Sequence, residues 1–308
     1  MKRIYALILI SFSTLSATAQ DYLGFINSNY AGITAVHLNP ANLADNRLVV
    51  DVDLFGFNAA FANNYISISH DALKKDNNYL SSKNPTSFYI KHRPAFDDDQ
   101  FQNKYLKERL NGANKSVFLA LNLNLPSCMV ALDKKSAIGF SWRERNYLNV
   151  DGIEENLARQ IYSGIEDTIG TQPLNYFNTE FHNKHFSVQY MSWVEYGGTY
   201  ARVLMDDGFH FLKAGATLKV LQGLGAAYLF VDDLDYKFTH HDTLSLFNTD
   251  VDYGHSTNFE YDDKNFKYKY ISNIAFGGDL GVVYEYRPER EKYKYDMNGE
   301  ANLDMKWK

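Results

Sequence analysis

The feature that most constrains this chain is a repeated alternation of apolar and polar residues with a period of two. In one stretch, Leu121 and Leu123 flank Asn122. Side chains of a β-strand point alternately to opposite faces, so such a stretch predicts a strand with one apolar and one polar face. The pattern occurs in 115–125, 136–147, 209–221 and 275–286. The chain therefore predicts an all-β protein built from two-faced strands.

The composition agrees with many strands. Aromatic residues make up 15% of the 308 residues, whereas there are only 6 prolines, and aromatic side chains favour strands while proline interrupts their ladders. The net charge of −6 provides no basic surface for nucleic acid. No apolar run beyond the N-terminus approaches the ~18 residues that a membrane helix needs. We therefore expect neither a nucleic-acid partner nor a helical membrane protein.

The N-terminus has the features of a secretory signal peptide. Lys2 and Arg3 precede an apolar stretch over 4–15, and Ala17-Thr18-Ala19 supplies small residues at the cleavage positions. We predict cleavage after Ala19 and export of the protein, with a buried N-terminal helix as the alternative. The single cysteine, Cys128, cannot form an intramolecular disulfide, so stability must come from a large core or from a closed sheet in lipid.

The connections between the expected strands differ in length in a regular way. Tight turns are predicted at 133–136 and 206–208, whereas 71–114, 148–183 and 232–267 are long and polar. With antiparallel strands, the tight turns fall on one side of the sheet and the long segments on the other. This asymmetry is typical of outer-membrane barrels. A soluble sandwich remains the alternative, because its strands are also two-faced.

The pattern predicts seven strands and a particular division of the chain. The expected strands are 47–70, 115–133, 136–147, 185–205, 209–231, 268–287 and one beginning near 300. Because bacterial single-chain barrels have an even number of strands, we expect the N-terminal half of a barrel of about 14 strands. A complete protein with miscounted strands is the alternative.

The expected domains are a signal peptide at 1–19, a plug, hatch or periplasmic segment at 20–46, and an antiparallel β-barrel at 47–308, incomplete at the C-terminus. Short helices are expected in the extracellular loops, over about 97–112 and 151–161.

Several motifs resemble known families of exported proteins. The motifs are Asn39-Pro40-Ala41 before the first strand, Leu125-Pro126-Ser127, the strand from Ala137 to Arg145, 219–223 and 278–288. Their order resembles a family of uncharacterised exported proteins of Bacteroidetes, known only as a domain of unknown function. The start of the chain is distantly similar to the long-chain fatty-acid transporter superfamily of outer-membrane barrels. This resemblance implies a β-barrel and a longer chain, and it carries no known activity.

The polar faces of the strands provide the candidate site residues. If the sheet is a barrel, its polar side faces the lumen. The residues expected there are Asp51, Asp53, Arg143, Arg145, Lys213, Lys219, Asp279 and Glu285. Asn39, Pro40 and Ala41 form the expected plug motif. Asp51 and Asp53 share a face and could form an acid–base pair, but a hydrated lumen wall explains them more simply.

The sequence contains no motif of a known catalytic, metal or cofactor site. His182 with His185, and His240 with His241, lack the further ligands of a zinc site. The acidic run at 232–235 lacks the spacing and glycine of a calcium loop. We therefore predict no enzyme activity, no cofactor and no metal site, with calcium binding by this acidic run as the alternative.

Three functions fit these observations. The first is an outer-membrane channel for small hydrophobic or amphiphilic molecules. The second is a barrel that does not transport and acts as a scaffold or secretion-system accessory. The third is a soluble periplasmic β-sandwich that binds a ligand. The partners expected for the first two are outer-membrane lipid and the barrel-assembly machinery.

Overall fold

The computed structural model describes most of the chain. The described residues are 23–28, 30–73, 104–163, 168–169, 172–173, 177–240, 243–262, 265–268, 273–288, 294–297 and 300–304. The predicted signal peptide at 1–19 lies outside them. Among the described residues, no helix is long and apolar enough to cross a membrane.

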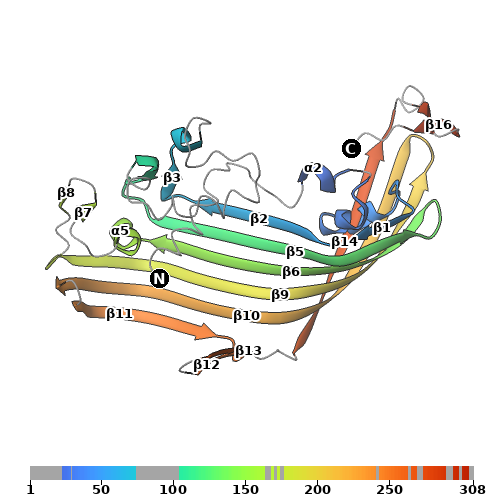
Figure 1. Ribbon diagram of the computed structural model, residues 1–308. Helices are drawn as coiled ribbons and strands as arrows, with labels where there is room; N and C mark the ends of the chain where they lie inside the picture. Colours follow the sequence, from blue (N-terminus) through green and yellow to red (C-terminus); the bar gives the residue numbers. More distant parts are fainter. Residues whose placement is uncertain are drawn as a thin grey trace.

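One antiparallel sheet dominates the structure (Figure 1). Its strands are β1 (Val50–Asp53), β2 (Gly56–Asn63), β5 (Lys115–Ala131), β6 (Ser136–Ile153), β9 (Glu180–Asp206), β10 (His210–His240), β11 (Thr243–His255) and β14 (Ile274–Tyr286). The order is β1-β5-β6-β9-β10-β11, with β2 also paired to β5 and β14 also paired to β10. The expectation of an all-β, antiparallel fold is confirmed.

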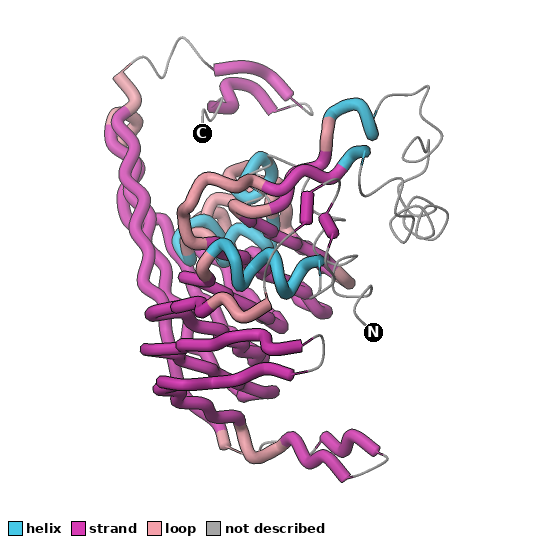
Figure 2. Tube along the Cα trace, turned by 90° about the vertical axis from the view of Figure 1, so that its left-hand side faces the viewer, coloured by secondary structure: helices cyan, strands magenta, loops and turns pink. Residues whose placement is uncertain are grey.

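The remaining elements are short. Four two-stranded pairs are β3 (Ile66–Ile68) with β4 (Leu106–Glu108), β7 (Thr168–Ile169) with β8 (Gln172–Pro173), β12 (Phe259–Asp262) with β13 (Asn265–Tyr268), and β15 (Lys294–Met297) with β16 (Glu300–Asp304). The helical segments are α2 (Leu23–Ile26), α5 (Glu155–Ser163) and the 3-10 helices η1 (Gly32–His37), η2 (Pro40–Leu43) and η3 (His70–Leu73). Figure 2 shows the helical segments gathered on one side of the large sheet.

The count of seven wall strands is wrong for the described residues. β10 pairs with β14 through 210–222 and with β11 through 227–240, so β11 and β14 share one edge. β1 and β2 likewise share β5, which leaves six positions across the sheet. β16, where the sequence predicts a seventh wall strand, pairs with β15 instead. Within the described residues the sheet is not closed into a barrel.

The long polar segments contain more regular structure than the sequence predicts. β10 continues to His240, and β11 lies inside the segment 232–267, for which a loop is expected. The hairpin does alternate, with Tyr236 and Phe238 buried on one face of β10 and Asp235 and Lys237 between them on the other, but its many charged residues favour a loop when the composition alone is considered.

The two expected helices differ in their outcome. The helix expected from 151 begins at Glu155, and the carboxylate of Glu154 accepts hydrogen bonds from the backbone N–H of Asn156 and Leu157. These two donors belong to the first turn of the helix, so Glu154 caps it. Residues 97–103 of the helix expected at 97–112 lie outside the described residues, and β4 occupies 106–108 of the remainder.

The two tight turns form where the sequence predicts them. The Asp133 carboxylate accepts hydrogen bonds from the backbone N–H of Lys135 and Ser136, at 2.6 and 2.7 Å. In the second turn, the Asp207 carboxylate accepts from the backbone N–H of His210 at 2.6 Å. These backbone donors lower the pKa of each aspartate below its ordinary range. Both carboxylates therefore fix the reversal of the chain between long strands.

Candidate functional site

The two faces of the sheet have opposite character. On one face, large apolar side chains are exposed, including Leu218 (78%), Phe276 (78%) and Leu280 (88%). The other face is the one on which η1 and η2 lie, and the sheet curves around them (Figure 1). We call these the apolar face and the concave face. The alternation in the sequence therefore assigns the two faces of β5, β6, β10 and β14 correctly.

Four charged residues join four strands on the concave face. Lys219 on β10 lies 2.6 Å from Asp279 on β14 and 3.5 Å from Glu195 on β9. Arg145 on β6 lies 3.2 Å from the other oxygen of Glu195. Glu195 is 7% exposed and also accepts a hydrogen bond from the indole N–H of Trp193 at 2.8 Å. We call Arg145, Glu195, Lys219 and Asp279 the ion cluster.

We call residues 30–46, which include η1 and η2, the N-terminal segment. A polar cavity of about 380 Å³ lies between the ion cluster and this segment. Its lining includes Arg143, Arg145, Lys219 and Asp279 from the sheet, and Asn39 from the segment before η2. Arg143 is 5% exposed and belongs to the same face. Three cationic side chains and one carboxylate thus line the cavity, which gives the lining a formal charge of +2.

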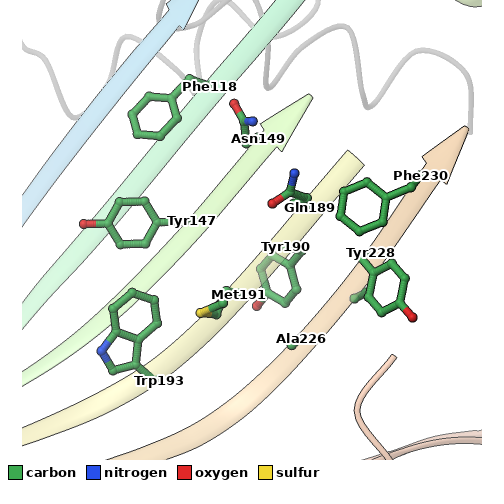
Figure 3. A pocket seen from close by; sticks show the side chains of 11 residues that line it. Phe118, Tyr147, Asn149, Gln189, Tyr190, Met191, Trp193, Ala226, Tyr228 and Phe230 are labelled. Carbon is green, nitrogen blue, oxygen red and sulfur yellow. The ribbon is translucent and has the colours of Figure 1, made fainter. Parts of the chain in front are cut away.

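An aromatic trough continues along the concave face beyond the ion cluster. It has a volume of about 480 Å³ and consists chiefly of Phe118, Tyr147, Met191, Trp193, Tyr228 and Phe230. The rings of Tyr147 and Trp193 stack with centroids 5.4 Å apart. Figure 3 shows Tyr228 and Phe230 across Met191 from this pair, with Asn149 and Gln189 nearby.

Arg145 connects the trough to the polar cavity. Its guanidinium carbon lies 5.2 Å from the ring centroid of Tyr147 and 5.3 Å from that of Trp193. It also donates a hydrogen bond to the Tyr147 hydroxyl. These cation–π contacts place a positive charge at the end of an apolar surface. The concave face can therefore offer a ligand an apolar region and a cationic region next to each other.

The predicted plug motif is seated on glycines of the concave face. A β-carbon at Gly215 would lie 2.6 Å from the Pro40 carbonyl carbon and 2.7 Å from the Ala41 nitrogen. The Asn39 side chain accepts from the Ala41 N–H at 2.9 Å and donates to the Val282 carbonyl oxygen at 3.2 Å. Asn39 therefore both caps η2 and holds it against β14.

A small apolar core lies beneath this segment. It consists of Ile33, Val36, Leu43, Ala44, Met129, Ala137, Ala201, Val203 and Phe211. Residues of the N-terminal segment thus share one core with residues of β5, β6, β9 and β10. The segment is packed on the sheet through both this core and the glycine contacts.

Two predicted site residues of β1 lie on the concave face but outside the ion cluster. Asp51 accepts a hydrogen bond from the Ile33 N–H at 2.8 Å, and Asp53 shares its face. Asp51 therefore holds the N-terminal segment through this hydrogen bond.

The last two predicted site residues also lie on this face, away from the cluster. Lys213 is fully buried and donates to the Ala44 carbonyl oxygen. Glu285 forms an ion pair with Arg287 at 2.7 Å. Lys213 therefore belongs with the packing of the N-terminal segment rather than with the polar cavity.

The sequence predicts the strand β9 but identifies neither Glu195 nor any residue of the aromatic trough as a site residue. Glu195 and Trp193 share one face, but Val194 and Tyr196 are also large and apolar or aromatic. Without clear alternation, the sequence does not assign a face to each residue. The register does, because Glu195 pairs with Arg143 on β6.

Two of the candidate histidines pair with residues of the acidic run. His182 lies 2.7 Å from Asp235, and His185 lies 3.4 Å from Asp232, across β9 and β10. Among the described residues, no group of three or more His, Cys, Asp or Glu is arranged to hold a metal ion.

Comparison with known proteins places most of this structure within one sequence family. Residues 40–300 match the family described as "Family of unknown function (DUF5723)". The matched range includes the ion cluster, the aromatic trough and η2. No curated protein and no solved structure matches the chain.

Proposed function

The chain belongs to the family of unknown function that its residues 40–300 match, and we propose that it is an outer-membrane β-barrel protein that admits small hydrophobic or amphiphilic molecules. The observation that carries this proposal is the opposite character of the two sheet faces. In a soluble protein, an apolar face of this extent would be covered by a second layer. In a membrane barrel, lipid covers it and water fills the concave side.

The position of the charges supports the same arrangement. The ion cluster lies on the concave face, and neighbouring residues of the same strands, such as Leu218 and Leu280, lie on the apolar face. A charge that faced lipid near the bilayer centre would cost about 2–4 kcal/mol. We infer that the cluster lines a hydrated interior.

The N-terminal segment acts in this proposal as the plug of the channel. Its contacts with β10 and β14 seat it against the wall beside the polar cavity. A plug at this place is also what the resemblance of Asn39-Pro40-Ala41 to the start of fatty-acid transporters would imply. Passage would require the segment to move or would follow a route beside it.

Cell fractionation and gel migration test the membrane assignment. The full-length protein should sediment with outer membranes, and the extracted protein should migrate differently on a denaturing gel before and after boiling, as folded barrels do. Recovery of folded protein in the soluble periplasmic fraction would contradict the proposal. Deletion of 20–46 tests the plug separately. If the protein still inserts but uptake of a hydrophobic dye is unchanged, the membrane assignment is supported and the role of the segment as a plug is contradicted.

A further inference from the structure

We propose that the aromatic trough and the ion cluster together form one binding site for a flat aromatic ring system that carries an anionic group. This inference rests on the proposed function, because it takes the concave face as the wall of a solvent-filled interior. It goes further by stating which chemical class is bound and which side chains recognise each part.

The trough supplies the surface for the ring system. Its volume of about 480 Å³ is within the range of small-molecule sites, and its lining is aromatic with few polar groups. Tyr147 and Trp193 present nearly parallel rings, with 15° between their planes. Aromatic faces bind other flat rings by offset stacking, which an acyl chain cannot reproduce. Met191 between the two aromatic groups can adapt to ligands of different outline (Figure 3).

The neighbouring charges select an anion. Glu195 is nearly buried and already receives the Arg145 guanidinium, the Lys219 ammonium and the Trp193 N–H, so it has little capacity for a ligand. With Glu195 counted, the polar cavity and the ion cluster together hold three cations, Arg143, Arg145 and Lys219, against two carboxylates, which leaves a formal charge of +1. The Nε–H group of Arg145 is buried and donates to no acceptor among the described residues. A carboxylate or sulfonate at this end would receive charge-assisted hydrogen bonds.

Arg145 fixes the order of the two parts. Because its guanidinium touches the trough rings and lines the polar cavity, the anionic group must lie at the Trp193 end. The amides of Asn149 and Gln189 line another part of the trough and can accept or donate hydrogen bonds to polar substituents of the ring system.

Two dyes that differ in a sulfonate group provide the test. The protein is the chain of residues 1–308 with Trp142→Phe and Trp307→Phe, which leaves Trp193 as the only tryptophan of these 308 residues. The anionic probe is 1-anilinonaphthalene-8-sulfonate, and the neutral probe is N-phenyl-1-naphthylamine. Saturable energy transfer from Trp193 to each probe measures binding at the trough. We expect the anionic probe to bind about tenfold more tightly than the neutral one.

Variants separate the two parts of the site. Arg145→Gln should weaken the anionic probe about tenfold and the neutral probe less than about twofold. Lys219→Gln should also weaken binding of the anionic probe more than that of the neutral probe. This second variant is used if Arg145→Gln fails to fold. The matched control is Arg202→Gln, which removes an exposed arginine of β9 that lines neither cavity and should change neither affinity. Equal losses for both probes, or no saturable transfer from Trp193, would overturn the proposal.

Two further outcomes distinguish this inference from the proposed function. Octanoate should compete with the anionic probe much less well than 2-naphthoate, and equal competition would contradict the preference for rings. Every variant is also tested for heat-dependent gel migration. A protein that shows the shift but binds no probe would refute the site alone. A protein that binds the anionic probe selectively without inserting into membranes would refute the proposed function and leave the site.

Discussion

The ammonium group of Lys213, which has no exposed surface, donates a hydrogen bond to the carbonyl oxygen of Ala44 across 3.2 Å. Lys213 lies on β10, and Ala44 directly follows η2. A buried ammonium group is tolerated only where hydrogen bonds replace its hydration. This contact therefore ties the N-terminal segment to the sheet at a point far from it in sequence.

Removal of this tie should loosen the N-terminal segment. Lys213→Met keeps an unbranched side chain of similar length but leaves the Ala44 carbonyl without this donor, at a cost of about 1–3 kcal/mol. We expect faster hydrogen exchange of the backbone amides of 31–44 and little change in β5 or β6. Unchanged exchange in 31–44 would show that the hydrogen bond does not hold the segment.

The glycine seat offers a second test of the same packing. Gly215→Ala adds a β-carbon that meets the backbone of Pro40 and Ala41, and such overpacking typically costs about 1–3 kcal/mol. The control is Gly198→Ala on β9, where an added β-carbon meets no atom within 4 Å. Limited proteolysis should release the N-terminal segment faster from the first variant only. The same rate for both variants would mean that the close approach is unimportant.

The assignment of the two faces is tested by one substitution at two leucines of β10. Leu218 is exposed on the apolar face, whereas Leu221 lies on the concave face and pairs with Glu195. Leu218→Arg should destabilise the inserted protein by about 2–4 kcal/mol, because the charge would face lipid. Leu221→Arg places the same charge on the concave face, where water can hydrate it, and should assemble nearly normally. The yield of heat-modifiable protein in membranes measures both, and equal yields would contradict the assigned faces.

The fold could be predicted from the sequence wherever one face of a strand is uniformly apolar. In β14, Phe276 and Leu280 against Asp279 leave only one orientation, and the structure has it. In the outer part of β10 and in β11 the alternation continues, as at Tyr236 and Phe238, but the dense charged residues favour a loop, so a loop is predicted where the structure has a hairpin.

The charged residues could be assigned to a face but not to partners, because partners depend on strand register. The register pairs Lys219 with Gly277 and Asp279 with Thr217. The ion pair between Lys219 and Asp279 is therefore diagonal between the two strands. A diagonal contact cannot be predicted from either strand alone, so the ion cluster could not be foreseen.

Acid should weaken one contact at the beginning of β5. The Glu155 carboxylate of α5 forms an ion pair with Lys115 at 2.9 Å and accepts hydrogen bonds from the backbone N–H of Asn111 and Gly112. Burial opposes its ionisation, but these donors outweigh burial and hold the pKa of Glu155 below its ordinary value of 4.5. Because the folded-state pKa is lowered, the contact contributes its full stabilisation at a pH above the ordinary pKa of Glu155. This stabilisation is lost as the pH falls through the lowered pKa.

We therefore expect the protection of the Asn111 and Gly112 amides against hydrogen exchange to fall as the pH is lowered below about 4.5, the ordinary pKa of Glu155. Glu155→Gln should show weaker protection at neutral pH and little further change on acidification. If the variant loses protection with pH as the wild-type protein does, another group is responsible.

The central claim is that the apolar face contacts lipid while the concave face contacts water, and two adjacent residues of β14 test it most directly. Each of Asp279→Cys and Leu280→Cys is made with Cys128→Ser, and the proteins in lipid vesicles are treated with a membrane-impermeant maleimide. We predict that the cysteine at 279 reacts and that the cysteine at 280 reacts only after the vesicles are dissolved in denaturant. Leu280 is 88% exposed on the sheet, so in a protein surrounded by water a cysteine there would react at least as fast as its neighbour. Rapid labelling at position 280 in intact vesicles would contradict the account.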